Sequence, residues 1–298
     1  MKVQKRDGSF EDLSPEKLNN SVMWACKDLQ NTNPSDIVMN AKIQMFDGIK
    51  TTKIHEALIS SAMNMIQLRT PNYQYVAARL LSFYTRKQLF GVYLDEDMPK
   101  IEDIIQLNID KGYYDESILD KFTKSQLVEL NAAINHANDD KLTFAAYRKM
   151  LDSYVTRDRK TGYLYETPQY TFMMIAMTTF DTVPEIVAYY EDFVEKRTSL
   201  PTPPMAGLRT KSKQFASCVL IDIGDDLESI YASMHAIGRF VSRKAGIGAN
   251  YGRIRPVGSS IRGGEVTHTG VIPFLKLGQA STKSCCLTSD TWVEILDE

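Results

Sequence analysis

A single thiol followed by glycine-rich and arginine-rich stretches carries the most informative chemistry in this sequence. Cys218 lies in the apolar run Phe215-Ala-Ser-Cys-Val-Leu-Ile221, which predicts a buried strand. Residues 245–252 read Ala-Gly-Ile-Gly-Ala-Asn-Tyr-Gly, and such backbone can approach a ligand closely. Arginine can donate two parallel hydrogen bonds to phosphate oxygens, and arginines follow at positions 253, 255 and 262. Together these residues predict a nucleotide site beside a thiol that takes part in a reduction.

Each of these features also has a plainer interpretation. A glycine-rich loop often only ends a helix, and a cysteine in an apolar strand is most often a small core residue. The glycines do not fit a dinucleotide-binding turn, because that turn follows a strand, whereas a predicted helix precedes residue 245. We therefore expect no Rossmann site.

Composition excludes several classes of protein. The chain has 298 residues, of which 43% are hydrophobic, and this is enough for two or three hydrophobic cores. Its formal net charge of −2 argues against a nucleic-acid-binding surface. No apolar run is long enough for a membrane helix and the first residues lack a signal-peptide core, so the expected location is the cytoplasm. The cysteines at positions 26, 218, 285 and 286 have no metal-ligand spacing. Cys26 lies on an amphipathic helix and is expected in the core.

Residues 1–90 are expected to form a small α-rich unit. Lys5-Arg-Asp-Gly8 is a turn signal between two short extended pieces, and Ser14-Pro15 marks the start of a helix. Apolar residues at helical spacing predict further helices, one after a cap at Thr51-Thr52 and one over residues 73–89.

The rest of the chain changes from helical to mixed character. Helical periodicity continues to about residue 200, with helices expected at 171–179 and 185–197, and Pro201-Thr-Pro-Pro204 is expected to break helix. A strand from Cys218 then leads into an amphipathic helix, which together make a βα unit. The inward face of that helix is expected to consist of Leu227, Ile230, Met234, Ile237 and Val241.

Several of these motifs carry a resemblance to a known family. Read in order, Ser217-Cys-Val-Leu-Ile, Arg243-Lys-Ala-Gly-Ile-Gly, Gly252-Arg-Ile-Arg, Ser260-Ile-Arg-Gly-Gly-Glu and His268-Thr-Gly resemble the large subunit of aerobic, class I ribonucleotide reductase. Near the amino terminus, Lys5-Arg-Asp-Gly and Phe46-Asp-Gly-Ile-Lys-Thr resemble the ATP-cone, a regulatory nucleotide-binding module.

The resemblance implies a mixed fold in several parts. These are an α-rich ATP-cone at 1–90, a helical domain at 91–200 and, at 201–285, the first, incomplete part of a ten-stranded α/β barrel.

The resemblance also implies roles for individual residues. Cys218 matches one half of the dithiol that supplies two electrons while the ribose 2′-hydroxyl leaves as water. The implied substrate contacts are Thr202, Ser217, Ala245 and Gly246. Asp225, Arg255 and Arg262 match the specificity site for an effector nucleoside triphosphate. The implied ATP-cone ligands are Val3, Lys5, Arg6, Glu11, Thr51, His55 and Lys87.

In the resembled enzymes, a thiyl radical reduces ribonucleoside diphosphates to deoxyribonucleoside diphosphates for DNA synthesis. The expected ligands are ATP or dATP and other nucleoside triphosphates as effectors, with the metal on a separate small subunit and none in this chain. The expected partners are that radical-generating subunit, the remainder of the large subunit, a second copy of the complete chain, and thioredoxin or glutaredoxin. The sequence contains neither the second thiol nor the radical cysteine, so we expect the 298 residues alone to be inactive.

The residues from Cys286 depart from the reductase pattern. Cys286-Leu-Thr-Ser-Asp-Thr-Trp-Val293 resembles the opening of an intein, in which the first cysteine attacks the preceding carbonyl to form a thioester. Residues 286–298 are therefore expected to begin a splicing segment that behaves as half of a split intein. A divergent loop or a truncated reading frame is the alternative.

Two other functions remain open at this point. One is a non-enzymatic nucleotide-binding regulator built on the ATP-cone, which would have no use for the reductase motifs of residues 215–285. The other is a splicing precursor in which the reductase portion is the flanking cargo, and this is compatible with the reductase interpretation.

Overall fold

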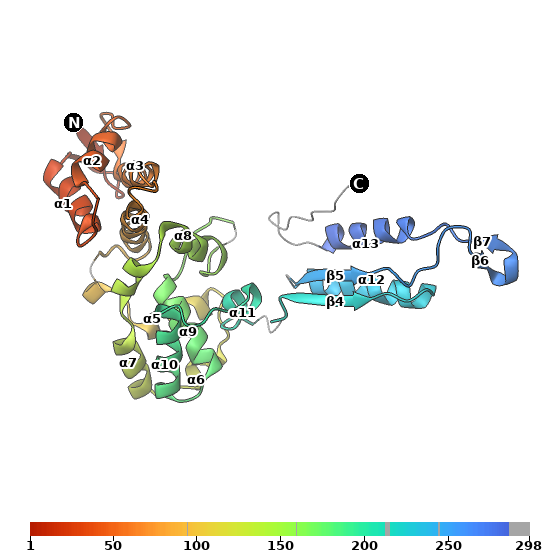
Figure 1. Cartoon of the computed structure of the whole chain (residues 1–298). Helices are drawn as coiled ribbons and strands as arrows, with labels where there is room; N and C mark the ends of the chain where they lie inside the picture. Colours follow the sequence, from red (N-terminus) through yellow and green to blue (C-terminus); the bar gives the residue numbers. More distant parts are fainter. Residues whose placement is uncertain (94, 159, 212–214, 244, 286–298) are drawn as a thin grey trace. The chain divides into compact units, whose positions relative to one another are not determined.

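The computed structural model describes residues 1–93, 95–158, 160–211, 215–243 and 245–285. These residues form two compact units (Figure 1). The first contains residues 1–199 and 209–211, and the second contains residues 200–208 and the described residues from 215 onward. No helix in the described ranges is both long and apolar enough to cross a lipid bilayer.

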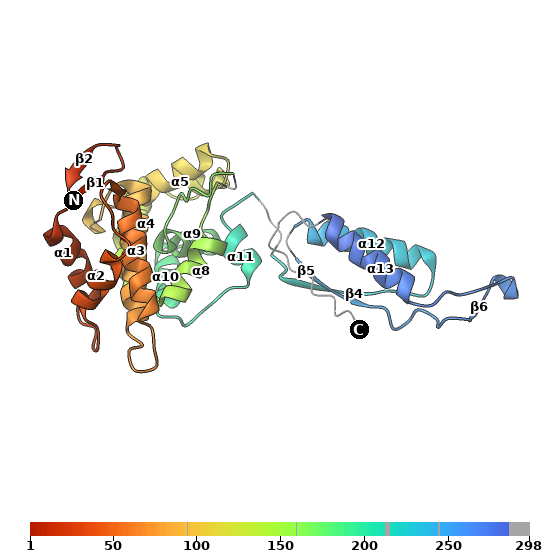
Figure 2. The same ribbon diagram turned by 90° about the horizontal axis from the view of Figure 1, so that it is seen from above.

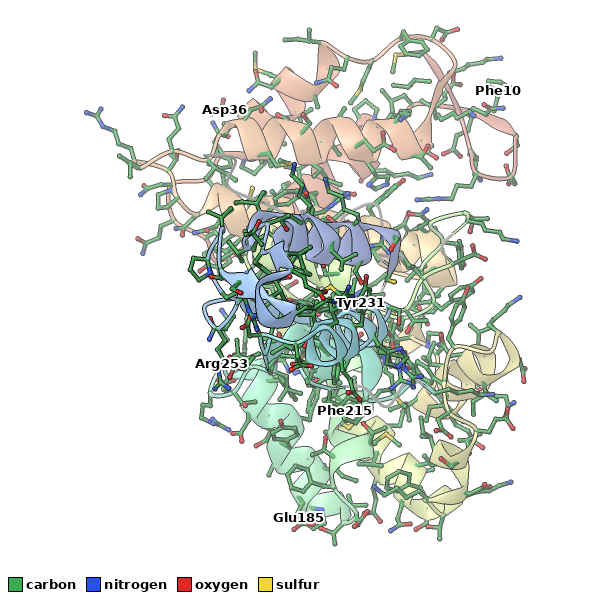
Figure 3. All side chains as sticks on the ribbon, turned by 90° about the vertical axis from the view of Figure 1, so that its right-hand side faces the viewer. Phe10, Asp36, Glu185, Phe215, Tyr231 and Arg253 are labelled. Atoms are coloured by element: carbon green, nitrogen blue, oxygen red, sulfur yellow. The ribbon has the colours of Figure 1, made fainter. Side chains whose placement is uncertain are left out.

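A small three-stranded sheet begins the first unit. The central strand β1 (Lys2–Gln4) pairs antiparallel with β2 (Phe10–Asp12) and parallel with β3 (Ile49–Lys50). The predicted turn between β1 and β2 is confirmed, since the Gly8 N–H donates to the Lys5 carbonyl at 3.1 Å and Gly8 adopts a φ of 87°. Phe10 projects from this hairpin and is 59% exposed (Figure 3).

Four helices pack behind this sheet. They are α1 (Pro15–Cys26), α2 (Pro34–Lys42), α3 (Thr51–Asn64) and α4 (Tyr73–Phe90). Ser14 caps α1 as predicted, with its side chain accepting from the Lys17 N–H, and Cys26 is buried in the core as expected. The predicted threonine cap is wrong: because β3 runs directly into α3, Lys50 is the N-cap residue and Thr51 is already helical.

The remainder of the first unit is helical. It consists of η1 (Asp95–Asp97), α5 (Ile101–Asp110), α6 (Ser117–Asp120), α7 (Lys124–Ala133), η2 (His136–Lys141), α8 (Phe144–Ser153), α9 (Pro168–Thr179) and α10 (Val183–Val194). It contacts α4 through α8 and η2. The helices expected at 171–179 and 185–197 are confirmed as α9 and α10. Tyr147, Leu151 and Val155, in and after α8, share one core with α1–α4, so packing continues across residue 90 and the expected domain borders remain predictions.

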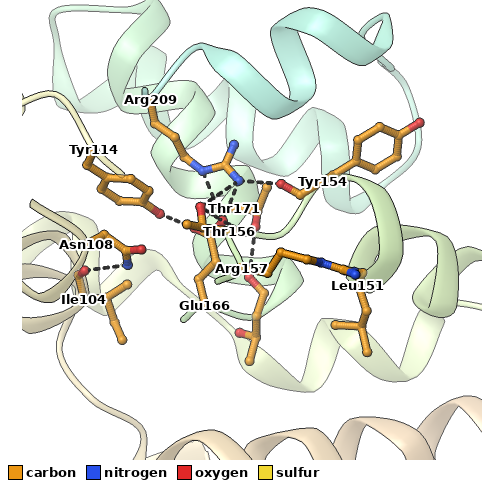
Figure 4. Close-up of polar contacts among 11 residues, drawn as sticks. Ile104, Asn108, Tyr114, Leu151, Tyr154, Thr156, Arg157, Glu166, Thr171 and Arg209 are labelled. Atoms are coloured by element: carbon orange, nitrogen blue, oxygen red, sulfur yellow. Dashed lines mark hydrogen bonds and ion pairs between the residues drawn. The ribbon is translucent and has the colours of Figure 1, made fainter. Parts of the chain in front are cut away.

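A buried ion pair joins residue 209 to the helical part (Figure 4). Glu166 accepts hydrogen bonds from the Tyr114 hydroxyl, from the Thr156 N–H at 2.7 Å and from Arg209 Nε at 3.1 Å. The Glu166 and Arg209 side chains are both fully buried. Arg209 also donates to the Tyr154 carbonyl at 2.6 Å, so this network fixes the point at which the chain returns to the first unit.

The second unit begins with a short helix that the sequence did not predict. α11 (Thr202–Gly207) includes Pro203 and Pro204, which were expected to break helix. They lie in the first turn, where backbone N–H groups have no partner within the helix and proline is tolerated.

A two-stranded parallel sheet follows. β4 (Cys218–Asp222) pairs with β5 (Gly246–Asn250) in a register that places Cys218 opposite Gly246. α12 (Leu227–Val241) packs on both strands and α13 (Ile272–Cys285) packs on α12 (Figure 2). Between β5 and α13 lie β6 (Ser260–Ile261), η3 (Arg262–Gly264) and β7 (Val266–Thr267).

Several expectations for this unit are wrong. The residues taken as a glycine-rich loop form strand β5. The strand from Cys218 is not buried: Cys218 is exposed and Leu220 is 83% exposed, because among the described residues β4 has one neighbouring strand and helices over one face only. Ile230, Met234, Ile237 and Val241 point inward as predicted. Leu227 is 62% exposed, since it is the first residue of α12, beyond the reach of that core.

Candidate functional site

A cavity of about 680 Å³ lies between the β1–β2 hairpin, α1, the start of α3 and the end of α4. The structure brings all the expected ATP-cone residues to this one cavity. They are Val3, Lys5, Arg6, Glu11, Thr51, His55 and Lys87. These residues are spread over more than 80 positions of sequence, so their convergence is a result of the fold.

The hairpin and the helix ends fix the positions of these side chains. Val3 is 2% exposed and pairs with Glu11 in one direction and with Ile49 in the other, which anchors β1 at the floor of the site. Thr51 starts α3, where Lys50 provides no side-chain cap and the first turn contains no acidic residue. At a helix start without such partners, the first backbone N–H groups are free to bind an anion such as phosphate.

Two lysines lie close to the Glu11 carboxylate in the cavity. Glu11 lies 3.8 Å from Lys5 Nζ and 3.7 Å from Lys17 Nζ. Both ion pairs are solvent-exposed, so each contributes little to stability and a ligand can replace it at small cost. Glu11 is an acceptor that suits amino or hydroxyl groups, whereas the lysines suit phosphates.

An aromatic wall lines another side of the cavity. Phe83 stacks on Tyr93 with ring centres 4.0 Å apart and also contacts Trp24 at 5.4 Å. The His55 ring lies between Phe83 and Tyr84, with centres 6.0 Å and 5.9 Å away. Burial, and then the nearby Arg6 charge, lower the pKa of His55 to about 4. His55 is therefore neutral at pH 7 and offers one donor and one acceptor.

The sequence did not indicate several residues of this cavity. Lys17 and Asn20 on α1, together with Phe83 and Tyr93, line it but were not predicted. For Lys17 a signal existed, because it follows the Ser14 cap by three residues and must project near the hairpin. Tyr93 follows the end of α4, and nothing in the local sequence indicates that it folds back onto Phe83.

Three of the four expected substrate residues, Ser217, Ala245 and Gly246, meet at the start of the β4–β5 pair. The Gly246 N–H donates to the Ser217 carbonyl at 2.9 Å, and Cys218 lies opposite Gly246 in the register. A β-carbon on Gly246 would lie 3.5 Å from that carbonyl oxygen, which is an ordinary van der Waals contact, so the described neighbours do not by themselves require glycine at this position. Ala245 is buried beside them. Thr202 lies apart in sequence, at the first position of α11.

Two of the three expected specificity residues, Asp225 and Arg255, are engaged with each other. Asp225 accepts from the Arg255 N–H at 2.8 Å and from Arg255 Nε at 2.7 Å, and these bonds lower the pKa of the Asp225 carboxyl. Arg253 pairs instead with Asp222 at 2.6 Å. Arg262 adopts a left-handed φ of 51° at the start of η3, next to Gly263.

No group of three or more histidine, cysteine or acidic side chains is arranged as a metal site in the ranges that the structure describes. Cys286, the expected splicing residue, lies outside the described residues.

Comparison with known families matches three successive parts of the chain. The ATP cone domain matches residues 1–88, the all-alpha domain of ribonucleotide reductase matches residues 140–213, and its barrel domain matches residues 216–288. These matches confirm the mixed fold expected from the sequence.

Individual relatives give the same result. The chain is 39% identical over 289 residues to ribonucleoside-diphosphate reductase 1 subunit alpha of Escherichia coli (strain K12), covering 95% of this chain and 38% of that protein. The chain is 38% identical over 288 residues to the ribonucleoside-diphosphate reductase subunit alpha of Enterobacteria phage T4, covering 95% of this chain and 38% of that protein. It is 28% identical over 279 residues to the ribonucleoside-diphosphate reductase subunit alpha of Helicobacter pylori (strain J99), covering 92% of this chain and 34% of that protein.

The chain thus spans less than two fifths of the length of these curated relatives, at 38% of the first. It is homologous to the amino-terminal portion of class I ribonucleotide reductase large subunits, and it comprises an ATP cone, the all-alpha domain and part of the barrel domain.

Proposed function

We propose that the cavity of the ATP cone binds ATP or dATP as an allosteric effector. The observation that carries the proposal is the convergence of the seven expected ligands on one cavity of about 680 Å³, a size that suits a nucleotide. Cations and an uncapped helix start supply partners for phosphates, and Glu11 with neutral His55 supplies partners for a base or ribose.

Nucleotide binding to the whole chain, measured by calorimetry, tests this function. Lys87→Met and Lys5→Ala should each weaken ATP binding about tenfold or more, because a charge-assisted hydrogen bond contributes about 1.5–3 kcal/mol. Lys53→Ala is the matched control: Lys53 lies on α3, pairs with Glu56 at 2.6 Å and does not line the cavity. ATP binding that both cavity variants leave unchanged would contradict the assignment.

We further propose that the complete protein reduces ribonucleoside diphosphates. Cys218 would be one of two thiols that become a disulfide, as the two electrons replace the ribose C–O bond by C–H and the oxygen leaves as water. Ser217, Ala245 and Gly246 would line the substrate position beside it.

The proposed specificity effector is a second nucleoside triphosphate, at Asp225, Arg255 and Arg262. The proposed partners are a small radical-generating subunit, the remaining portion of the large subunit, a second copy, and thioredoxin or glutaredoxin. The match of residues 216–288 to the barrel domain weighs against a non-enzymatic regulator.

A splicing role at Cys286 is a separate proposal that rests on sequence alone. The barrel-domain match extends to residue 288, so a loop that continues the barrel is the competing interpretation. Co-expression with a complementary intein half, followed by intact-mass measurement, separates the two. Loss of the residues from Cys286 onward, blocked by Cys286→Ala, supports splicing, whereas ligation that persists without Cys286 contradicts it.

A further inference from the structure

Tyr93 holds the side chain of Lys87 at the edge of the cone cavity. The Lys87 ammonium lies over the Tyr93 ring, 4.3 Å from its centre. Phe83 stacks on the same ring, with centres 4.0 Å apart and an angle of 15° between the planes, so Tyr93 contacts both residues. Lys87 Nζ also donates to the Gly91 carbonyl at 2.6 Å, just beyond the end of α4.

This arrangement restricts a side chain that is normally mobile. A lysine has a flexible four-carbon stem, and holding it in one place opposes ligand binding by the loss of rotamer entropy. Here the Phe83–Tyr93 stack and the Gly91 carbonyl hold the ammonium before any ligand arrives. The ring attracts the charge through its π face, and Gly91 uses one of three N–H donors, which leaves donors for a ligand.

We propose that Tyr93 is a positioning residue, which orients the Lys87 ammonium toward the phosphates of the bound nucleotide. The inference rests on the proposed nucleotide site and adds a residue that acts through Lys87. Its effect should therefore be confined to ligands that carry phosphate and should vanish when Lys87 is replaced.

The test compares ATP and adenosine on the whole chain, with Tyr93→Leu and Tyr93→Phe as a pair. Tyr93→Leu should weaken ATP binding about two- to fivefold, the effect of losing a cation–π contact at a half-exposed position. Adenosine binding should stay unchanged. Tyr93→Phe keeps the ring and should restore ATP binding to the wild-type value. In a Lys87→Met background, Tyr93→Leu should have no further effect.

The outcomes separate this inference from the nucleotide site itself. Failure of the wild-type chain to bind ATP would overturn the proposed function. If ATP binds and Lys87→Met weakens it, but Tyr93→Leu does not, the positioning role is wrong and the site stands. An equal loss for ATP and adenosine would make Tyr93 a base contact or a purely structural residue. Tighter ATP binding by Tyr93→Leu would mean that the ring competes with phosphate, which also overturns the proposal.

Discussion

Replacing Arg209 should destabilise the first unit by far more than the loss of a surface ion pair. Arg209 and Glu166 are fully buried, and Arg209 donates to Glu166 and to the Tyr154 carbonyl. Arg209→Met would leave the Glu166 carboxylate buried without its counter-charge, although Thr156 and Tyr114 would still donate to it. Removing one partner of a buried pair costs about 3–5 kcal/mol, so we expect a loss of that size in the free energy of unfolding.

Urea unfolding followed by tryptophan fluorescence measures this loss. The sequence contains tryptophans at positions 24 and 292, so a Trp292→Phe background leaves Trp24 to report on the first unit. Lys141→Met is the control, because Lys141 pairs with Glu195 at 2.7 Å with both side chains 49% exposed and should cost about 1 kcal/mol or less. Equal losses for the two variants would refute the argument that burial makes the Arg209 pair costly to break.

Three further predictions concern individual residues. The pKa of His55 is about 4 in the folded chain and 6.5 in the unfolded chain, so the unfolded chain binds more protons as the pH falls below 6.5. Between pH 7.5 and 5.5, the free energy of unfolding should therefore fall by about 1 kcal/mol more for wild type than for His55→Gln. Urea unfolding measures this, and an equal pH dependence of the two proteins would contradict it. Gly278→Ala places a β-carbon in steric conflict with the Tyr251 hydroxyl, so it should destabilise the second unit by about 1–3 kcal/mol in thermal unfolding. Tyr251→Phe should rescue part of this loss, and no rescue would mean that another contact is responsible. In the complete, active protein, Cys218→Ser should abolish multiple turnover while effector binding, measured by calorimetry, stays within about twofold, because one atom of a redox group changes; sustained turnover would remove Cys218 from the chemistry.

Local signals predicted the first unit well. The turn at Gly8 and the cap at Ser14 depend on residues close in sequence, and the structure has both where the pattern places them. The cavity depends on distant segments, so its convergence was implied only by the family resemblance. Tyr93 was missed because its contact with Phe83 spans a helix end that no short pattern describes.

The second unit was harder to predict, because its strands depend on pairing between distant residues. The sequence of β5 (Gly246–Asn250) contains glycine, alanine and asparagine, which have little intrinsic preference for a strand, and it forms one by pairing with β4. The apolar sequence of β4 predicted burial on both sides, as parallel strands usually have, but α12 covers one face only and Leu220 is left 83% exposed.

The two candidate sites therefore differ in how much of each the described residues supply. The cone cavity has walls from the hairpin, α1, α3 and α4, all within one unit with a continuous core, so effector binding can be measured on this chain directly. Around Cys218, the β4–β5 pair supplies one edge of a site whose thiol is exposed to solvent. Reduction by a dithiol needs a second thiol within bonding reach of Cys218, and the family resemblance leads us to expect that thiol outside these 298 residues. Effector binding and ribonucleotide reduction are thus separable experiments, and success of the first gives no evidence about the second.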